Sequence, residues 1–287
     1  MNTPRLELIT TAPGVRIAAA RQGAGPAVLL SPGLGMPSGT WQFSGLPDAL
    51  VESGCSVITY TARGLKPSSA PPAPYSVAQM ADDAAAVLAH FGVDEAVLVG
   101  YSMGCYITQA LVSAWPGRVR GVAMVAGLRS SAIGELVNEM ELNLIDRLGT
   151  VPDAVVAFEQ LMTTLDPSML TDDATVRGWR QMTEGSQTPW ASDDGLRGQL
   201  TASHAWMTAG EPTVERLAAI DAPTLVIAYQ NDVFFPPAGS REAARHLPRG
   251  EFHVLDGQAH GGLMLDPHRR ATALLVDFCR RVHQPVG

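Results

Sequence analysis

The sequence predicts an α/β fold in which helices flank a mostly parallel sheet. Three features of the 287-residue chain support this prediction. Short apolar runs alternate with helical patterns, turn residues separate them, and the alternation stops in the middle of the chain before it resumes. Repeated β-α-β units of this kind place their strands parallel, with helices on both faces of the sheet.

The first part of the chain supplies the hairpin and the first repeated units. Residues 5–10 and 15–21 alternate in part on either side of Pro13-Gly14, a strong turn signal. Residues 27–30 are continuously apolar, as expected for a strand that is covered on both faces. The units that follow are a helix at 41–53, a strand at 56–60, a Pro-rich loop at 67–74, a helix from the N-cap Ser76 to 91, a strand at 95–99, a helix at 103–114 and a strand at 119–126.

Residues 129–210 do not continue this alternation of strands and helices. They contain four helical stretches, at 133–148, 155–165, 171–183 and 196–207, and no convincing strand. The β-α pattern then resumes with a strand at 222–229, a helix at 238–246, a strand at 251–255 and a helix at 267–282. We therefore predict a core domain formed by residues 1–128 and 211–287, and a helical cap, or lid, formed by residues 129–210 after the sixth strand.

Composition excludes several classes of function. The formal net charge of −8, with no run of Lys or Arg, argues against a nucleic-acid partner. No apolar run is long enough to cross a bilayer, and the N-terminus does not resemble a signal peptide. Cys55, Cys105 and Cys279 are scattered and make neither a disulfide framework nor a zinc spacing. No nucleotide-phosphate motif or metal cluster appears. We expect a cytoplasmic protein that acts on a small molecule without cofactor or metal, and the oligomeric state is not indicated.

The strongest local signal is the pentapeptide Gly-Tyr-Ser-Met-Gly at residues 100–104, which matches Gly-x-Ser-x-Gly. The predicted strand at 95–99 leads into it and the predicted helix at 103–114 leads out. In that context the glycines allow a sharp turn on which Ser102 takes a strained backbone conformation and projects its hydroxyl group. The pattern predicts that Ser102 is a nucleophile.

A serine hydroxyl needs a base within hydrogen-bond reach. His260 follows the last predicted strand in a short loop, which places it at the carboxyl edge of a parallel sheet, where ligands of such folds bind. The remaining histidines lie within or at the ends of predicted helices and strands, where structural or solvent-facing roles are expected: His90, His204, His246, His253, His268 and His283.

The base in turn needs an acid that holds its tautomer and stabilises the imidazolium. Asp232 follows the predicted strand at 222–229 and so lies at the same edge of the sheet. Asp256 is the main rival, although it ends the strand that carries His260 and could serve the turn instead. The order Ser102, Asp232, His260 is the order expected for such a sheet.

An oxyanion hole requires two preorganised donors. The backbone N–H of Met103, directly after the nucleophile, is one candidate. The second should come from the loop after the third strand, residues 31–35, and we assign it to the N–H of Leu34, between Gly33 and Gly35.

With these residues in place, the sequence resembles the α/β-hydrolase superfamily over nearly the whole chain outside the insertion. The landmarks are the pentapeptide, the strand Pro-Thr-Leu-Val-Ile before Asn231-Asp232, Ala259-His260-Gly261, Ser38-Gly-Thr-Trp41, and Arg63-Gly64 with Ser68. The resemblance implies an eight-stranded sheet and a helical lid over the active site. The chain departs from the family pattern at Ser31-Pro32-Gly33, where His-Gly is common, and at Thr61 and Lys66, where the family has Asp and Gly.

A serine nucleophile argues against the family branches that use Asp at this position, the epoxide hydrolases and haloalkane dehalogenases. We expect a carboxylesterase-like serine hydrolase that acts on a small, apolar substrate through an acyl-enzyme. Two alternatives stay open: a biosynthetic tailoring enzyme that uses the same residues for carbon–carbon cleavage, cyclisation or other non-ester chemistry, and a ligand-sensing protein without turnover.

The predicted cap is rich in apolar side chains that have two interpretations. They could form a hydrophobic acyl site, because Met adapts to irregular apolar shapes, or they could pack between the cap helices, which we favour. The residues concerned are Met140, Leu144, Leu161, Met162, Met169, Met182 and Met207.

Overall fold

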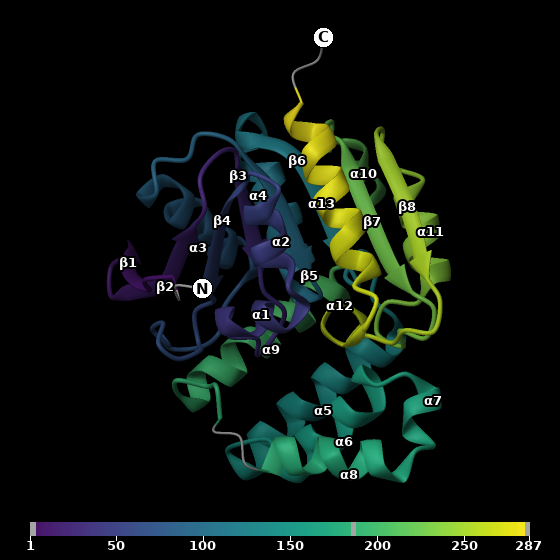
Figure 1. Cartoon of the computed structure of the whole chain (residues 1–287). Helices are drawn as coiled ribbons and strands as arrows, with labels where there is room; N and C mark the ends of the chain where they lie inside the picture. The colour runs from purple at the N-terminus through teal and green to yellow at the C-terminus, as the bar shows by residue number, and fades with distance from the viewer. Residues whose placement is uncertain (1–3, 185–187, 285–287) are drawn as a thin grey trace.

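The computed structural model describes residues 4–184 and 188–284. Within these residues eight strands form one sheet in the order β1-β2-β4-β3-β5-β6-β7-β8 (Figure 1). β2 pairs antiparallel with β1 and β4, and all the other neighbouring pairs of this sheet are parallel, so the predicted architecture is confirmed. The strands are β1 (Glu7–Ala12), β2 (Val15–Gln22), β3 (Ala27–Ser31), β4 (Ser56–Thr61), β5 (Ala96–Tyr101), β6 (Val119–Val125), β7 (Thr224–Tyr229) and β8 (Gly250–Leu255).

Helices cover both faces of the sheet (Figure 1). Side chains of α3, α4, α10 and α11 pack in the core on one face, and those of α1, α2, α12 and α13 pack on the other. Their bounds are α1 (Trp41–Ser44), α2 (Leu46–Glu52), α3 (Val77–His90), α4 (Met103–Ala114), α10 (Val214–Ala218), α11 (Pro237–Ala244), α12 (Gly262–Leu265) and α13 (Arg270–His283).

Two apolar cores explain why the central strands are continuously hydrophobic. Every residue of β3, β5 and β7 is buried. Because successive side chains of a strand point to opposite faces, Leu29 packs in the core beneath α3 and α4, whereas Val28 and Leu30 pack in the core beneath α2 and α13. A strand covered on both faces has no polar side to present.

The predicted N-cap at Ser76 is confirmed by a reciprocal pair of hydrogen bonds. The Ser76 hydroxyl accepts from the backbone N–H of Gln79 at 3.2 Å, and the Gln79 side-chain carbonyl accepts from the backbone N–H of Ser76 at 3.0 Å. This capping box satisfies two backbone N–H groups at the start of α3, which have no carbonyl partner within the helix.

Two predicted helices are interrupted. The helix predicted at 41–53 is divided into α1 and α2 by Gly45, whose φ of 64° is left-handed. The helix predicted at 267–282 begins only at Arg270, because the carboxylate of Asp266 accepts the backbone N–H groups of His268 and Arg270 and ends the separate short helix α12. Local side-chain capping of this kind competes with helix continuation.

Six helices follow β6 and precede β7 in the described part of the chain, and the five before α10 gather at one end of the sheet (Figure 1). These five are α5 (Ala132–Leu148), α6 (Asp153–Thr164), α7 (Pro167–Leu170), α8 (Asp173–Glu184) and α9 (Asp193–Thr208). We keep the name cap for residues 129–210; the division into a cap and a core domain stays a prediction. No helix among the described residues combines the length and apolar character needed to cross a bilayer.

The methionines of the cap do not all pack between helices as predicted. Met207 on α9 is 6% exposed, which fits a packing role. Met140 on α5, Met162 on α6 and Met182 on α8 are 37%, 47% and 60% exposed. The packing interpretation is therefore wrong for these three residues, because helical spacing alone does not reveal which face of a helix meets its neighbour.

Candidate active site

Ser102 occupies the turn between β5 and α4. Its backbone, at φ 54° and ψ −126°, adopts a conformation that residues other than glycine rarely take. The Ser102 N–H donates to the carbonyl of Val125 at 3.0 Å, which ties the turn to the neighbouring strand β6. Such strain costs on the order of 1–3 kcal/mol and persists only where the surrounding structure imposes it. The turn thus holds the Ser102 hydroxyl at the carboxyl end of β5.

Two glycines allow other backbone segments to approach this turn. A Cβ atom on Gly104 would lie 2.0 Å from the carbonyl oxygen of Ser31, so a larger residue would push α4 away from the end of β3. A Cβ atom on Gly33 would lie 3.2 Å from the Cβ atom of Ser102. The loop that follows β3 therefore lies directly beside Ser102.

His260 lies in the loop after β8 and reaches Ser102. Its Nε2 atom is 3.0 Å from the Ser102 hydroxyl oxygen, and its Nδ1 atom is 2.9 Å from Oδ2 of Asp232. Asp232 follows β7, so the carboxyl ends of three strands bring these three residues together. All three residues selected from the sequence thus form one continuous hydrogen-bonded chain.

The carboxylate of Asp232 is oriented by the backbone that follows it. Its Oδ1 atom accepts from the N–H groups of Phe234 and Phe235 at 2.9 and 3.0 Å, which leaves Oδ2 facing His260. The side chain of Asp232 is 0% exposed. A buried carboxylate needs such partners to remain charged, and here backbone donors and an imidazole N–H satisfy it.

Aromatic rings surround the imidazole of His260. The rings of Tyr101 and Phe235 lie nearly parallel to it, with centroids 5.4 and 5.6 Å away, and the ring of Phe234 meets it edge-on at 5.2 Å. None of these three aromatic residues was predicted as a site residue from the sequence. Their positions were the available signal, because Tyr101 directly precedes Ser102 and the two phenylalanines closely follow Asp232.

The cap also contacts the loop that carries His260. The backbone N–H of His260 donates to the Thr163 carbonyl at 3.3 Å, and that of Gly261 donates to the Thr164 carbonyl at 3.1 Å. Both acceptors lie at the end of α6. The position of His260 therefore depends on a cap helix as well as on the sheet, which the sequence did not indicate.

The rival residues lie elsewhere. Asp256 is exposed, and its backbone carbonyl accepts from the Arg270 guanidinium at 2.9 Å. His253 lies 2.6 Å from Glu251, and His90 lies 3.0 Å from Glu7, both in partly exposed pairs. These contacts agree with the structural and turn roles expected for them.

The two backbone groups predicted for the oxyanion hole flank Ser102. Met103 begins α4. Leu34 lies in the loop after β3, which approaches Ser102 closely at Gly33. Within the described residues, neither N–H donates a hydrogen bond to another part of the chain. The assignment of Leu34 and Met103 stays a prediction that this arrangement favours.

Cys105 is another nucleophilic side chain close to the turn that carries Ser102. It is 0% exposed, and its thiol donates to the Gly100 carbonyl at 3.2 Å. Burial raises the pKa of the thiol far above its ordinary value. The group stays protonated at neutral pH and does not compete with Ser102, because the thiolate is the reactive form.

The chain matches the family model for the α/β-hydrolase fold over residues 26–267. Together with the sheet and the strained serine turn, this match places the chain in the α/β-hydrolase family.

Curated relatives and solved structures agree with this placement. BpoC of Mycobacterium tuberculosis, which carries the name of a non-heme bromoperoxidase, is 30% identical over 89% of this chain and 95% of its own length, and its crystal structure superposes with a TM-score of 0.81. The rhodomycin D methylesterase DnrP of Streptomyces peucetius is 27% identical over 81% of this chain and 84% of its own. An esterase from Thermogutta terrifontis shares the fold, with a TM-score of 0.80 and 24% identity over 99% of this chain and 100% of its own. The family match and the similarity to DnrP support a hydrolase activity, and the Thermogutta structure supports the fold.

Proposed function

We propose that this chain is a serine hydrolase that cleaves carboxylic esters of small, apolar substrates through an acyl-enzyme. The observation that carries the proposal is the chain of hydrogen bonds from Ser102 through His260 to Asp232. A hydroxyl, an imidazole and a buried carboxylate in this order form the arrangement that activates serine for acyl transfer.

In the first half of the reaction the Ser102 oxygen attacks the ester carbonyl, and Nε2 of His260 takes the hydroxyl proton. The negative charge that develops on the carbonyl oxygen is stabilised by the N–H groups of Leu34 and Met103. When the tetrahedral intermediate collapses, His260 gives its proton to the departing alcohol. The acyl group is then bound to Ser102 as an ester.

In the second half His260 takes a proton from water, which attacks the acyl-enzyme carbonyl. Collapse of the second intermediate releases the acid, and the proton returns to Ser102. The nearby carboxylate of Asp232 keeps a proton on Nδ1 of His260, so that Nε2 is the unprotonated nitrogen facing Ser102. The tautomer follows from the hydrogen-bond network.

The surroundings of the reacting groups support an apolar substrate. Phe234, Phe235 and Tyr101 enclose His260, and the candidate oxyanion donors Leu34 and Met103 themselves carry apolar side chains. The similarity to the methylesterase DnrP favours ester cleavage over the carbon–carbon and cyclisation chemistry that the sequence also allows.

A second candidate reaction uses the same acyl-enzyme. BpoC and a non-heme haloperoxidase of Rhodococcus erythropolis, which is 26% identical over 89% of this chain, carry names of peroxide-using proteins. If hydrogen peroxide replaced water as the attacking group, His260 would take a peroxide proton and the acyl group would leave as a peracid. Ser102 would be regenerated as in hydrolysis, without a redox change at the protein.

The test is product analysis of short-chain aryl esters in ¹⁸O-labelled water, with Ser102→Ala as the control. Ester hydrolysis predicts acid and alcohol, one labelled oxygen in the acid, and loss of both products in the variant. Added peroxide distinguishes the second candidate by peracid formation. Tight ligand binding without any acylation would contradict both reactions and favour a ligand-sensing protein.

A further inference from the structure

Gln199 joins the cap to two loops of the sheet. It lies on α9 and is 0% exposed. Its side-chain Oε1 accepts from the backbone N–H of Gly35 at 2.9 Å, and its Nε2 donates to the carbonyl of Arg63 at 2.7 Å. The pairing defines the orientation of the amide, because the oxygen faces a donor and the nitrogen faces an acceptor.

The Gly35 contact lies one peptide unit from the candidate oxyanion donor. The hydrogen bond fixes the plane of the Leu34–Gly35 peptide, and this plane adjoins the one that carries the Leu34 N–H. The same loop is already close to Ser102, since a Cβ atom on Gly33 would lie 3.2 Å from Ser102 Cβ. A rotation of the loop at Gly35 would therefore move the Leu34 N–H relative to the reacting carbonyl.

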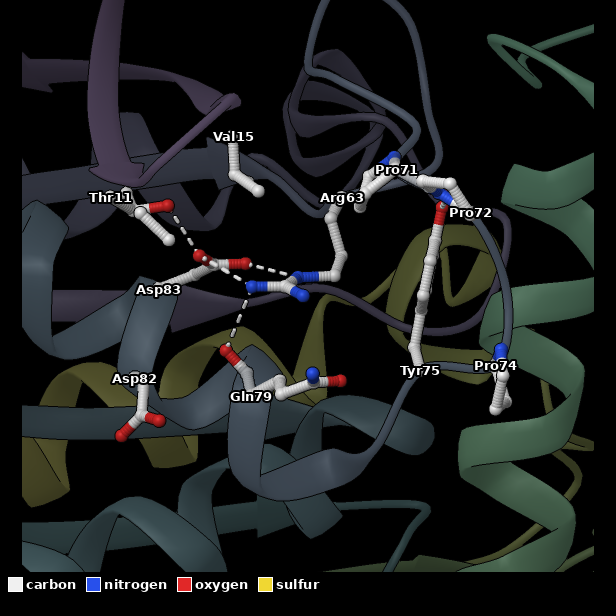
Figure 2. A pocket seen from close by; sticks show the side chains of 11 residues that line it. Thr11, Val15, Arg63, Pro71, Pro72, Pro74, Tyr75, Gln79, Asp82 and Asp83 are labelled. Carbon is white, nitrogen blue, oxygen red and sulfur yellow. Dashed lines mark hydrogen bonds and ion pairs between the residues drawn. The ribbon is translucent and has the colours of Figure 1, made fainter.

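The Arg63 contact provides a rigid reference point. The Arg63 guanidinium binds both carboxylate oxygens of Asp83, at 2.7 and 3.0 Å, and donates to the Gln79 carbonyl at 3.3 Å (Figure 2). These groups line a cavity of about 340 Å³ that Ser102, Asp232 and His260 do not line. Because its side chain is fixed by three hydrogen bonds, Arg63 presents its carbonyl to Gln199 in one position.

Neighbouring residues of the cap strengthen this connection. The N–H of Ala191 donates to the Gly64 carbonyl at 2.9 Å, and the N–H of Lys66 donates to the Pro189 carbonyl at 2.8 Å. A Cβ atom on Gly35 would lie 3.3 Å from the ring of Trp190. Residues 189–199 of the cap are thus attached to both loops, and Gln199 is the residue whose side chain bridges them.

From these contacts we propose that Gln199 is a positioning residue for the oxyanion hole, by which the cap sets the direction of the Leu34 N–H. The proposal rests on the proposed function, because it assigns Leu34 a role in acyl transfer. It gives the cap a part in catalysis beyond covering the site. Gln199 itself does not touch the reacting atoms.

A loss of this bridge should affect the transition state more than substrate binding. Removal of one oxyanion donor typically lowers kcat by about 10²–10³-fold. Gln199→Met leaves the donor present but releases its loop, so we expect kcat to fall by about 10- to 100-fold, with KM changed by less than about threefold. Affinity for an alkyl trifluoromethyl ketone, whose adduct with serine carries an oxyanion, should fall by a similar factor.

The experiment compares three variants with wild-type protein. Gln199→Met removes both hydrogen bonds. Gln199→Glu keeps the acceptor for the Gly35 N–H but loses the donor to the Arg63 carbonyl, so it should recover part of the lost kcat. Gln109→Met is the matched control, because Gln109 is also 0% exposed and its amide has no hydrogen-bond partner within the described residues. Amide hydrogen exchange of residues 31–36 is measured beside kcat, KM and ketone affinity, and should accelerate in Gln199→Met alone.

The outcomes separate the two proposals. Wild-type protein that fails to hydrolyse esters or to bind the ketone covalently would contradict the proposed function. Active wild-type protein, with kcat and ketone affinity unchanged in folded Gln199→Met, would overturn the positioning role alone. If Gln199→Met does not fold, Gln199→Glu provides the test. Amide hydrogen exchange of residues 31–36 that is as slow as in wild-type protein supports the role of the acceptor. Fast exchange together with an unchanged kcat overturns the positioning role.

Discussion

The hydroxyl group of Tyr101 donates a 2.7 Å hydrogen bond to the backbone carbonyl of His260. The residue before the candidate nucleophile thus holds the loop that carries the candidate base. Burial raises the pKa of the Tyr101 hydroxyl far above its ordinary value, so the group remains a donor throughout the range in which enzymes are assayed.

Tyr101→Phe should therefore weaken both stability and catalysis. The buried His260 carbonyl loses its partner, which should lower the free energy of unfolding by about 1–3 kcal/mol. The base becomes less well placed, and we expect kcat to fall by about 3- to 10-fold. Urea unfolding and ester kinetics measure the two effects. Tyr229→Phe is the control, because the buried Tyr229 hydroxyl has no hydrogen-bond partner among the described residues; equal effects of both substitutions would contradict this role of Tyr101.

Asp232→Asn should impair catalysis while leaving the fold intact. An amide in place of the carboxylate favours the wrong tautomer of His260 and does not stabilise the imidazolium, so kcat should fall by about 10⁴-fold. Steady-state kinetics of Asp232→Asn and Asp256→Asn test the choice between the two carboxylates. Loss of activity only in Asp256→Asn would show that the acid has been assigned to the wrong strand.

A carboxyl pair in the cap should make stability depend on pH. Burial raises the pKa of Glu141 on α5 and of Glu159 on α6, and at Glu141 the charge of Glu159 adds to this effect. The folded state then retains protons that the unfolded state releases. The stabilisation that these protons give the folded state is complete below the pKa of Glu in the unfolded chain, about 4.3. It is lost as the pH rises through the raised pKa values of the pair.

Glu141→Gln should flatten this dependence, because the amide can donate to an ionised Glu159. Denaturant unfolding between pH 5 and pH 9 should show a loss of stability in wild-type protein that exceeds the loss in the variant by at least about 1.4 kcal/mol, the equivalent of one pKa unit. Glu139→Gln, at an exposed position of the same helix, is the control. The same pH profile in all three proteins would rule out the pair as its source.

The buried ion pair between Arg63 and Asp83 should be costly to break. Their side chains are 7% and 3% exposed, and Asp83 also accepts from the hydroxyl of Thr11 (Figure 2). Asp83→Asn leaves the guanidinium buried without its counter-charge, and should destabilise the fold by about 3–5 kcal/mol. Asp82→Asn, exposed and adjacent, should change the unfolding free energy by less than about 0.5 kcal/mol. Similar unfolding midpoints for both variants would contradict this account.

Much of the sheet and of the site could be predicted because it depends on local patterns. Runs such as residues 27–30 indicate strands buried on both faces, and Ser76 indicates a helix start. Since parallel strands end at one edge, loops after three strands were expected to meet there. That geometric rule predicted that Ser102, Asp232 and His260 lie close together, without knowledge of the strand order.

The remaining features depend on contacts between distant residues. Gln199 meets Gly35 across 164 positions of sequence, and no local pattern distinguishes it from an ordinary helical glutamine. The contact of Thr163 with His260 depends on how α6 packs against the sheet. The exposure of Met140 and Met162 has the same origin, because the relative orientation of cap helices is set by tertiary packing rather than by periodicity.

Active-site labelling with a fluorophosphonate tests the central claim most directly, because the reagent forms a covalent adduct only with an activated serine. Purified wild-type and Ser102→Ala proteins are treated, and any adduct is located by mass spectrometry. The account predicts one adduct, on Ser102, and none in the variant. Folded wild-type protein that remains unlabelled, or carries its adduct on another residue, would contradict the assignment of Ser102 as the nucleophile.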